Sequence, residues 1–230
     1  MRIRCGVGVE HTGVVTSADP LARLEPSLNR HTPATVRGVV LLLHGGTEHS
    51  TTPVDGRSAS WRRMAAIQRA VDAGARRQGV ATALLRYRVR GWNGDGASPI
   101  EDARWALERL EAEHPGVPIV LLGHSMGGRT AIHVADHRGV VGVVGLAPWW
   151  PADSPVSALR GRHLRAAHGR ADKITSARAT RALVAAAEPV TASAEFTDMG
   201  PVGHYMLRHI RDWNTYARET ALGLLDRAAV

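Results

Sequence analysis

The pattern that most constrains how this chain can fold is a series of strand-length segments that alternate with segments of helical periodicity. Apart from Arg37, residues 36–43 form an apolar run, which is typical of a parallel strand whose two faces are both covered. Further strands are predicted at residues 80–87, 119–123, 140–146, 164–168 and 194–197. This alternation predicts an α/β protein with a mostly parallel central sheet and helices on both faces.

The segments between the strands repeat their apolar residues at the spacing of amphipathic helices. Helices are predicted over residues 58–77, 99–113 and 176–187, and from about residues 126 and 206 onward. In the helix over residues 99–113, four polar residues are expected to face water: Glu101, Asp102, Arg104 and Glu108.

The length of 230 residues fits a single three-layer domain over residues 1–230. Residues 1–35 are expected to be less regular, with one or two weak strands in residues 1–16 and a loop over residues 17–35. No repeat or linker divides the chain. Every candidate site residue below follows a predicted strand, and in parallel sheets sites lie at the carboxyl ends of the strands.

The composition argues against several other classes of protein. Hydrophobic residues make up 44% of the chain, the level of an ordinary globular protein. No apolar run reaches about eighteen residues, so no membrane-spanning helix is expected. The first residues lack the apolar stretch of a signal peptide, and a single cysteine, Cys5, excludes an internal disulfide. These observations favour a cytoplasmic protein with no membrane partner.

The formal net charge of +8 is carried almost entirely by arginine, since Lys173 is the only lysine. Such a charge can indicate nucleic-acid binding or an acidic partner. Here the arginines are scattered and interspersed with acidic residues on predicted helices, whereas binding arms show basic blocks. The distribution favours a protein that does not bind nucleic acid, and it leaves open a mild preference for anionic substrates.

The strongest local motif is GHSMGG at residues 123–128. It follows a predicted strand and opens a predicted helix, which is the context of a G-x-S-x-G nucleophile elbow. Such a turn lifts the serine hydroxyl above the sheet, and Gly123 and Gly127 leave space that a Cβ atom would fill. The helix that begins at Met126 directs backbone N–H groups at the same point. Ser125 is therefore the predicted nucleophile.

A serine hydroxyl is a weak nucleophile and needs a neighbouring base. When the serine lies on such an elbow, the acid and then the histidine follow it in the chain. His204 lies in the loop between the last predicted strand and the C-terminal helix, and this loop can reach back over Ser125. His209 is the alternative base, although the pattern places it inside the helix. His204 is the predicted base.

The acid is expected after a strand that lies between Ser125 and His204 in the chain. Asp172 fits, because the strand over residues 164–168 ends and Gly169 permits a turn just before it. Its carboxylate would hold the imidazole in one tautomer and stabilise the imidazolium. Asp172 could instead cap the next helix. Two other residues are alternatives as the acid: Asp153 and Asp198.

Attack on a carbonyl creates an oxyanion, which needs preorganised hydrogen-bond donors. One expected donor is the backbone N–H of Met126, directly after the nucleophile. The second is expected in the loop HGGT at residues 44–47, where two glycines let the main chain approach a ligand closely. Gly46 is the predicted donor in that loop, and Thr47 is the next choice.

Together these motifs resemble the α/β-hydrolase family. The resemblance rests on HGG at residues 44–46, GHSMGG at 123–128, GRAD at 169–172 and GH at 203–204, which occur in the family's order. It implies an α/β-hydrolase fold and a serine hydrolase. Many family members carry a large helical cap after the strand that follows the nucleophile helix. Here only about sixteen residues separate that strand from the next, so a minimal lid is expected.

A minimal lid predicts a shallow or open pocket. Trp149 and Trp150 follow a predicted strand and are candidates for an apolar pocket wall, although core packing is an equal alternative. Thr47 and His124 are further candidates for substrate contact. For His124, a packing or hydrogen-bonding role beside the serine is the alternative.

The predicted reaction is hydrolysis of a carboxylic ester or thioester through an acyl-enzyme, with a small-molecule acyl substrate and no cofactor. Two alternatives stay open: acyl transfer or cyclisation by the same triad, and a non-catalytic hydrolase-like binding protein. No H-E-x-x-H motif, cysteine cluster or G-x-x-x-x-G-K loop is present, so metal catalysis and nucleotide hydrolysis are not expected. The sequence leaves the oligomeric state undetermined.

Overall fold

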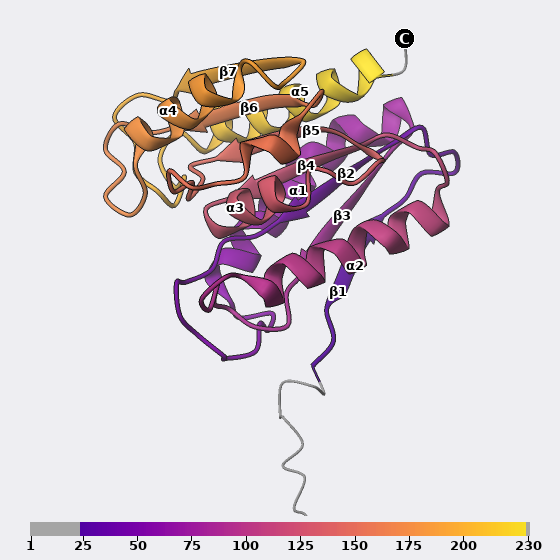
Figure 1. Ribbon diagram of the computed structural model, residues 1–230. Helices are drawn as coiled ribbons and strands as arrows, with labels where there is room; N and C mark the ends of the chain where they lie inside the picture. The colour runs from indigo at the N-terminus through magenta and orange to yellow at the C-terminus, as the bar shows by residue number, and fades with distance from the viewer. Residues whose placement is uncertain (1–23, 229–230) are drawn as a thin grey trace, which may run out of the picture.

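The computed structural model describes residues 24–228, which form a central sheet between two layers of helices (Figure 1). The strands are β1 (Ser27–His31), β2 (Gly38–Leu43), β3 (Val80–Arg86), β4 (Ile119–His124), β5 (Val140–Leu146), β6 (His163–His168) and β7 (Ser193–Asp198). The α-helices are α1 (Ala59–Ala75), α2 (Ala97–Glu113), α3 (Met126–His133), α4 (Ala177–Ala187) and α5 (Ile210–Ala228). Short 3₁₀ helices cover Arg76–Gln78 and Val156–Leu159.

The order of the seven-stranded sheet is β1-β3-β2-β4-β5-β6-β7. All neighbouring pairs are parallel except β1 and β3, which are antiparallel. Strand β4 is therefore central, and β2 and β5 flank it. The loops that follow β2, β4, β6 and β7 leave the sheet at its carboxyl edge, where the predicted site residues lie.

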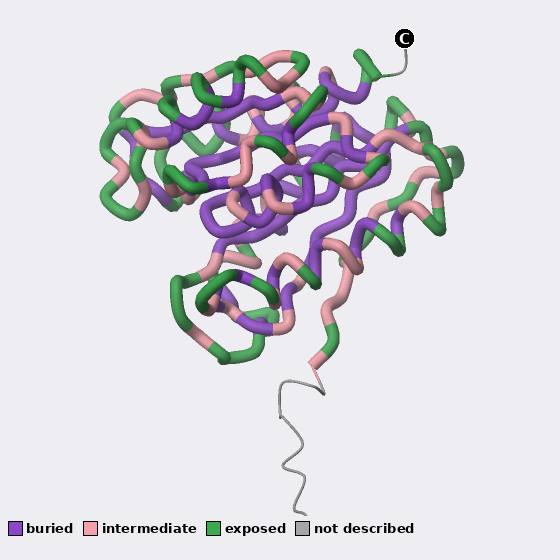
Figure 2. Tube along the Cα trace, viewed as in Figure 1, coloured by how far each residue is buried: buried purple, intermediate pink, exposed green. Residues whose placement is uncertain are grey.

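Both faces of the sheet are buried, which explains why the central strands are apolar throughout. In β2, Val39, Leu41 and Leu43 belong to the core on the side of α2, α3 and α4, whereas Val40 and Leu42 belong to the core on the side of α1 and α5. All five side chains are fully buried. Figure 2 shows this arrangement as buried strands at the centre with exposed turns at the rim. Burial of this kind stabilises the fold by roughly 1.5–3 kcal/mol for each large apolar side chain.

Each strand predicted after residue 36 is confirmed, with ends close to those expected. The predicted loop over residues 17–35 is wrong in part, because Ser27–His31 forms the edge strand β1. Leu28 is the only apolar residue of this strand and the strand is only partly buried, so it lacks the apolar pattern of the others. The weak strands predicted in residues 1–16 lie outside the described residues.

Two further expectations are corrected. The C-terminal helix begins at Ile210, not at Met206, because Met206 and His209 both adopt positive φ angles, of 57° and 54°. His209 therefore precedes the helix. Asp102 does not face water: it is 1% exposed and bonds Arg88 through the backbone N–H and the guanidinium. No helix in residues 24–228 combines the length and apolarity needed to cross a membrane.

Candidate active site

Ser125 occupies a strained turn at the carboxyl end of the central strand. Strand β4 ends at His124 and α3 begins at Met126, so Ser125 alone forms the connection. Its φ of 53° and ψ of −119° are rare for a residue with a side chain. Strain of this kind costs about 1–3 kcal/mol and clusters at functional sites.

Glycines on both sides of Ser125 let the elbow pack tightly. A Cβ atom at Gly123 would collide with the Gly127 backbone carbonyl, and a Cβ atom at Gly127 would collide with that of Leu43. The N-terminus of α3 is therefore pressed against the end of β2. A residue with a side chain at either glycine would move the serine.

His204 is placed to act as the base for Ser125. Its Nε2 lies 2.9 Å from Ser125 Oγ, and its Nδ1 lies 2.8 Å from Asp172 Oδ2. Since a carboxylate only accepts, Nδ1–H donates to Asp172 and Nε2 accepts from the serine hydroxyl. The structure thus brings together the three residues predicted as a triad, from loops after β4, β6 and β7.

Asp172 is held by donors from four other residues. The backbone N–H groups of Ile174 and Thr175 donate to Oδ1 at 2.7 and 2.9 Å. The Thr175 hydroxyl and His168 Nε2 donate to Oδ2 at 2.9 and 3.0 Å, beside His204. Burial raises the pKa of Asp172, but these hydrogen bonds outweigh it and hold the pKa well below its usual range. The carboxylate is therefore ionised at neutral pH.

His168 is a supporting residue that the sequence analysis missed. It is fully buried at the end of β6, and its Nδ1 lies 2.8 Å from the Thr180 hydroxyl. Because Nε2 donates to Asp172, Nδ1 accepts from Thr180. The bond from α4 fixes the tautomer that orients the triad carboxylate. The available signal was the position of His168 directly before the GRAD segment.

His124 lies against His204, the predicted base. Its Nε2 donates to the backbone carbonyl of His204 at 3.1 Å, and the two imidazole rings lie 4.9 Å apart. Burial, with the nearby His204, lowers the pKa of His124 to about 3. His124 is therefore neutral at pH 7. Its ring also lines the cavity described below, so the hydrogen-bonding role and the predicted substrate contact are compatible.

The loop after β2 lies directly against the nucleophile elbow. A Cβ atom at Gly45 would lie 3.3 Å from Ser125 Cβ, and one at Gly46 would lie 2.5 Å from Met126 Sδ. The two predicted oxyanion donors, Gly46 and Met126, are thus neighbours. The N–H of Thr47 already donates to Arg90 O at 2.9 Å, which argues against Thr47 as the second donor.

His44 shapes this loop from within the core. Its Nδ1 donates to Gly45 O at 2.6 Å, and its Nε2 accepts from the Tyr87 N–H at 3.4 Å. Complete burial lowers the pKa of His44 to about 4, so the ring is neutral. A neutral ring with one donor and one acceptor satisfies both neighbours. The Gly45 carbonyl is therefore turned toward the core.

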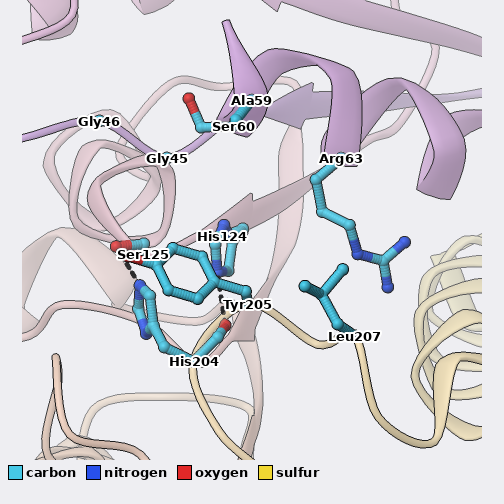
Figure 3. Close-up of a pocket in the computed structure, with 10 residues that line it drawn as sticks. All are labelled: Gly45, Gly46, Ala59, Ser60, Arg63, His124, Ser125, His204, Tyr205 and Leu207. Atoms are coloured by element: carbon cyan, nitrogen blue, oxygen red, sulfur yellow. Dashed lines mark hydrogen bonds between the residues drawn. The ribbon is translucent and has the colours of Figure 1, made fainter.

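A cavity of about 160 Å³ opens at Ser125 and His204 (Figure 3). Its walls are mostly apolar and come from the β2 loop, the start of α1, and the loop after His204. The lining residues are Gly45, Gly46, Ala59, Ser60, Arg63, His124, Ser125, His204, Tyr205 and Leu207. Figure 3 shows Arg63 reaching in from α1 on the side away from Ser125. The sequence analysis did not single out Ala59, Ser60, Arg63, Tyr205 or Leu207.

The structure places the other predicted pocket residues elsewhere. Trp150 is 3% exposed and donates through Nε1 to Gly128 O at 2.8 Å, so it belongs to the core. Trp149 is partly buried, and the Arg129 guanidinium lies 4.4 Å from its ring. Neither tryptophan lines the cavity, and neither does Thr47. For Trp150, the structure therefore agrees with the alternative prediction of core packing.

The alternative triad partners have other contacts. Asp198 lies 3.5 Å from the Arg170 guanidinium and accepts from the Gly200 N–H at 2.8 Å. Asp153 lies near Arg129, on another part of the surface. His209 is exposed, and its Nδ1 lies 3.0 Å from Asp212 Oδ2. Of the candidate acids, only Asp172 bonds His204 within residues 24–228.

This sheet order, with a serine on a strained turn after the central strand, defines the α/β-hydrolase class of fold. A model of the alpha/beta hydrolase family matches residues 40–229, so the chain belongs to that family. The predicted fold class is confirmed, and membership of the family supports a hydrolase. No curated protein matches the chain.

Solved structures with low sequence identity share the fold. An alpha-beta serine hydrolase homologue from Coxiella burnetii is 17% identical, with a TM-score of 0.66 over 85% of this chain and 91% of that one. Est1E from Butyrivibrio proteoclasticus, bound to ferulic acid, is 13% identical, with a TM-score of 0.63 over 88% and 96%. A serine hydrolase without a lid from Xanthomonas campestris is 18% identical, with a TM-score of 0.62 over 86% and 88%.

Proposed function

We propose that the protein is a serine hydrolase that cleaves a carboxylic ester or thioester through an acyl-enzyme on Ser125. The observation that carries the proposal is the continuous relay from Ser125 Oγ through His204 to Asp172 Oδ2, with links of 2.9 and 2.8 Å. Both links are within the range expected for a nucleophile, its base and the orienting acid.

In the first half-reaction, His204 Nε2 takes the proton of Ser125 as Oγ attacks the carbonyl carbon. Ionised Asp172 stabilises the imidazolium that forms. The negative charge that develops on the carbonyl oxygen is stabilised by the backbone N–H groups of Met126 and Gly46. The imidazolium then protonates the leaving alcohol or thiol, and the acyl group stays on Ser125.

In the second half-reaction, His204 takes a proton from water, which attacks the acyl carbon. The same two backbone donors stabilise the second oxyanion. Collapse of this intermediate releases the acid, and His204 returns the proton to Ser125 Oγ. His204 therefore accepts and returns the proton in both half-reactions.

The cavity limits the acyl group. Its volume of about 160 Å³ is below the roughly 300–1,000 Å³ of sites that hold drug-sized ligands. The 16 residues between β5 and β6 contain only the short 3₁₀ helix Val156–Leu159 and no cap domain. We therefore expect short acyl chains to be preferred over long ones on p-nitrophenyl esters.

The test compares Ser125→Ala with Ser60→Ala, since both remove a hydroxyl from the same cavity. Ser125→Ala is expected to lower the kcat for p-nitrophenyl butyrate by at least about 10⁴-fold and to abolish labelling by a fluorophosphonate probe. Ser60→Ala is expected to remain labelled. Turnover by Ser125→Ala at the wild-type rate would refute the proposal. Product analysis with added alcohols separates hydrolysis from acyl transfer.

A further inference from the structure

An open groove of about 520 Å³ adjoins the catalytic cavity along α1. Cavity and groove share three wall residues: Ala59, Arg63 and Leu207. The cavity and the groove therefore meet at these three side chains. A substrate that extends beyond the cavity on this side would lie next to the groove.

The groove is strongly basic. Its walls contain no aspartate or glutamate, and four of its lining residues are arginines: Arg57, Arg62, Arg63 and Arg69. Within residues 24–228, none of the four forms an ion pair with a carboxylate. Other arginines of the chain differ: Arg88 pairs with Glu101 and Asp102, and Arg90 pairs with Asp55. The positive charge of the groove is thus not neutralised by the described part of the chain.

The helix gathers these charges on one side. Arg62 and Arg69 are seven residues apart in α1, so they lie two turns apart on the same face. Both are exposed, as is Arg57 just before the helix. Arg63, one position further round the helix, reaches the catalytic cavity (Figure 3). All four arginines therefore line one groove, and Arg63 lines the cavity at Ser125 as well.

Arg63 is the most constrained of the four. Its Nη2 donates to Met206 O at 3.1 Å, while its Nε is buried and has no partner within residues 24–228. Burial lowers the pKa of Arg63, and no nearby carboxylate offsets this effect. A half-buried cation with no counter-charge, whose Nε is buried without a partner, is destabilised relative to one in water. A carboxylate or phosphate beside it would relieve this cost and accept from the free donors.

We propose that the substrate is an ester or thioester that carries an anionic group, a carboxylate or phosphate, and that this group binds in the arginine groove. The inference rests on the proposed function, because it names the substrate class of the same site. Arg63 binds the part of the anion nearest the cavity, and Arg57, Arg62 and Arg69 surround the outer part. The limited volume of the groove and its position beside a small cavity favour a small molecule over a nucleic acid.

The experiment uses matched pairs of esters that differ in one charge. The first pair is mono-p-nitrophenyl glutarate and p-nitrophenyl valerate, in which the anion of the charged ester lies on the acyl group. The second pair is the butyryl ester of 4-hydroxybenzoate and that of 4-hydroxybenzamide, in which the anion of the charged ester lies on the leaving group. In wild-type protein, at least one anionic ester is expected to have a higher kcat/KM than its neutral partner, with the gain mainly in KM.

The variant is Arg62→Gln/Arg69→Gln, since neither side chain makes a hydrogen bond within residues 24–228. The ratio of kcat/KM values, anionic over neutral, is expected to fall about five- to tenfold, as for two exposed charge pairs. The matched control is Arg109→Gln/Arg178→Gln, which removes two exposed charges from α2 and α4. This control is expected to keep the wild-type ratio.

Equal ratios in the wild type and the groove variant would overturn the proposal, as would an equal fall in the control variant. Either result leaves the proposed hydrolase function intact, because the neutral esters report it separately. If wild-type protein cleaves no ester, the proposed function fails. In that case, calorimetric titration of the Ser125→Ala protein with the same pairs of esters measures whether the groove binds the anionic group. Tighter binding of an anionic ester, lost in the groove variant, supports the inference, and equal binding overturns it.

Discussion

Gly46→Ala tests the proposed oxyanion site without touching the triad. The added Cβ atom would collide with the backbone carbonyl of Arg90 and lie 2.5 Å from Met126 Sδ, where ordinary contact begins at 3.4 Å. The methionine side chain can rotate away. The Arg90 carbonyl cannot, because it is backbone and accepts from the Thr47 N–H. The loop must therefore move by about 1 Å, since the overlap is of that size.

An N–H group stabilises an oxyanion when its nitrogen lies roughly 2.7–3.1 Å from the oxygen. A displacement of about 1 Å takes the Gly46 N–H out of that range. Loss of one such donor costs about 2.7–4 kcal/mol in the transition state, or about 100- to 1,000-fold in kcat. The substrate carbonyl binds before the charge develops, so KM is expected to change little. The folded protein is expected to lose stability as well, because backbone atoms are displaced.

The assay is the steady-state hydrolysis of p-nitrophenyl butyrate, with the melting temperature measured on the same samples. Gly223→Ala is the control, because a Cβ atom there meets nothing within 4 Å and the residue lies in α5. It is expected to keep kcat and to stabilise the protein by about 0.5–1 kcal/mol. A Gly46→Ala protein that is folded and retains a kcat within about threefold of wild type would refute the reasoning, since one donor supplies far more.

Three further predictions concern the residues around the base. Asp172→Asn is expected to lower kcat about 10⁴-fold in the same assay, and a loss under tenfold would point to another acid. His168→Leu is expected to lower the free energy of unfolding in urea by about 2–4 kcal/mol, because Asp172 and the Thr180 hydroxyl each lose a buried partner, and an unchanged value would contradict this. Burial lowers the pKa of His44 to about 4 and of His124 to about 3, so the unfolded chain binds more protons below pH 6.5 and stability falls on acidification. Each is expected to contribute a loss of about 2 kcal/mol between pH 7 and pH 5. If the stability of a His44→Phe variant depended on pH as that of the wild type does, the contribution assigned to His44 would be contradicted.

The central sheet could be predicted from sequence because burial on both faces leaves a strong signal. Val39 to Leu43 are apolar without interruption, since helices cover both sides of β2. The edge strand β1 carries no such signal, and only its pairing with β3 defines it. Asp102 was misplaced for a related reason. Its helical position pointed to solvent, but Arg88, which lies outside that helix, buries it.

The positions of Ser125, Asp172 and His204 followed from local context, because each lies in the segment that follows a strand of a parallel sheet. The pocket did not follow in the same way. Its wall depends on where α1 lies relative to the loop after His204, and that packing brings Arg63 to Met206 from far along the chain. The sequence left Trp150 open between the pocket wall and the core, and the space above Gly145 takes it into the core.

The proposed acyl-enzyme is the intermediate that tests the account most directly, because it can be trapped and located. Rapid acid quenching of the protein during turnover of a p-nitrophenyl ester, followed by peptide mass spectrometry, is expected to find the acyl group on Ser125. The signal is expected to be absent from Ser125→Ala and much weaker in His204→Gln, which lacks the base. An acyl group on a different residue, or equal acylation of the Ser125→Ala protein, would contradict the assignment of the nucleophile.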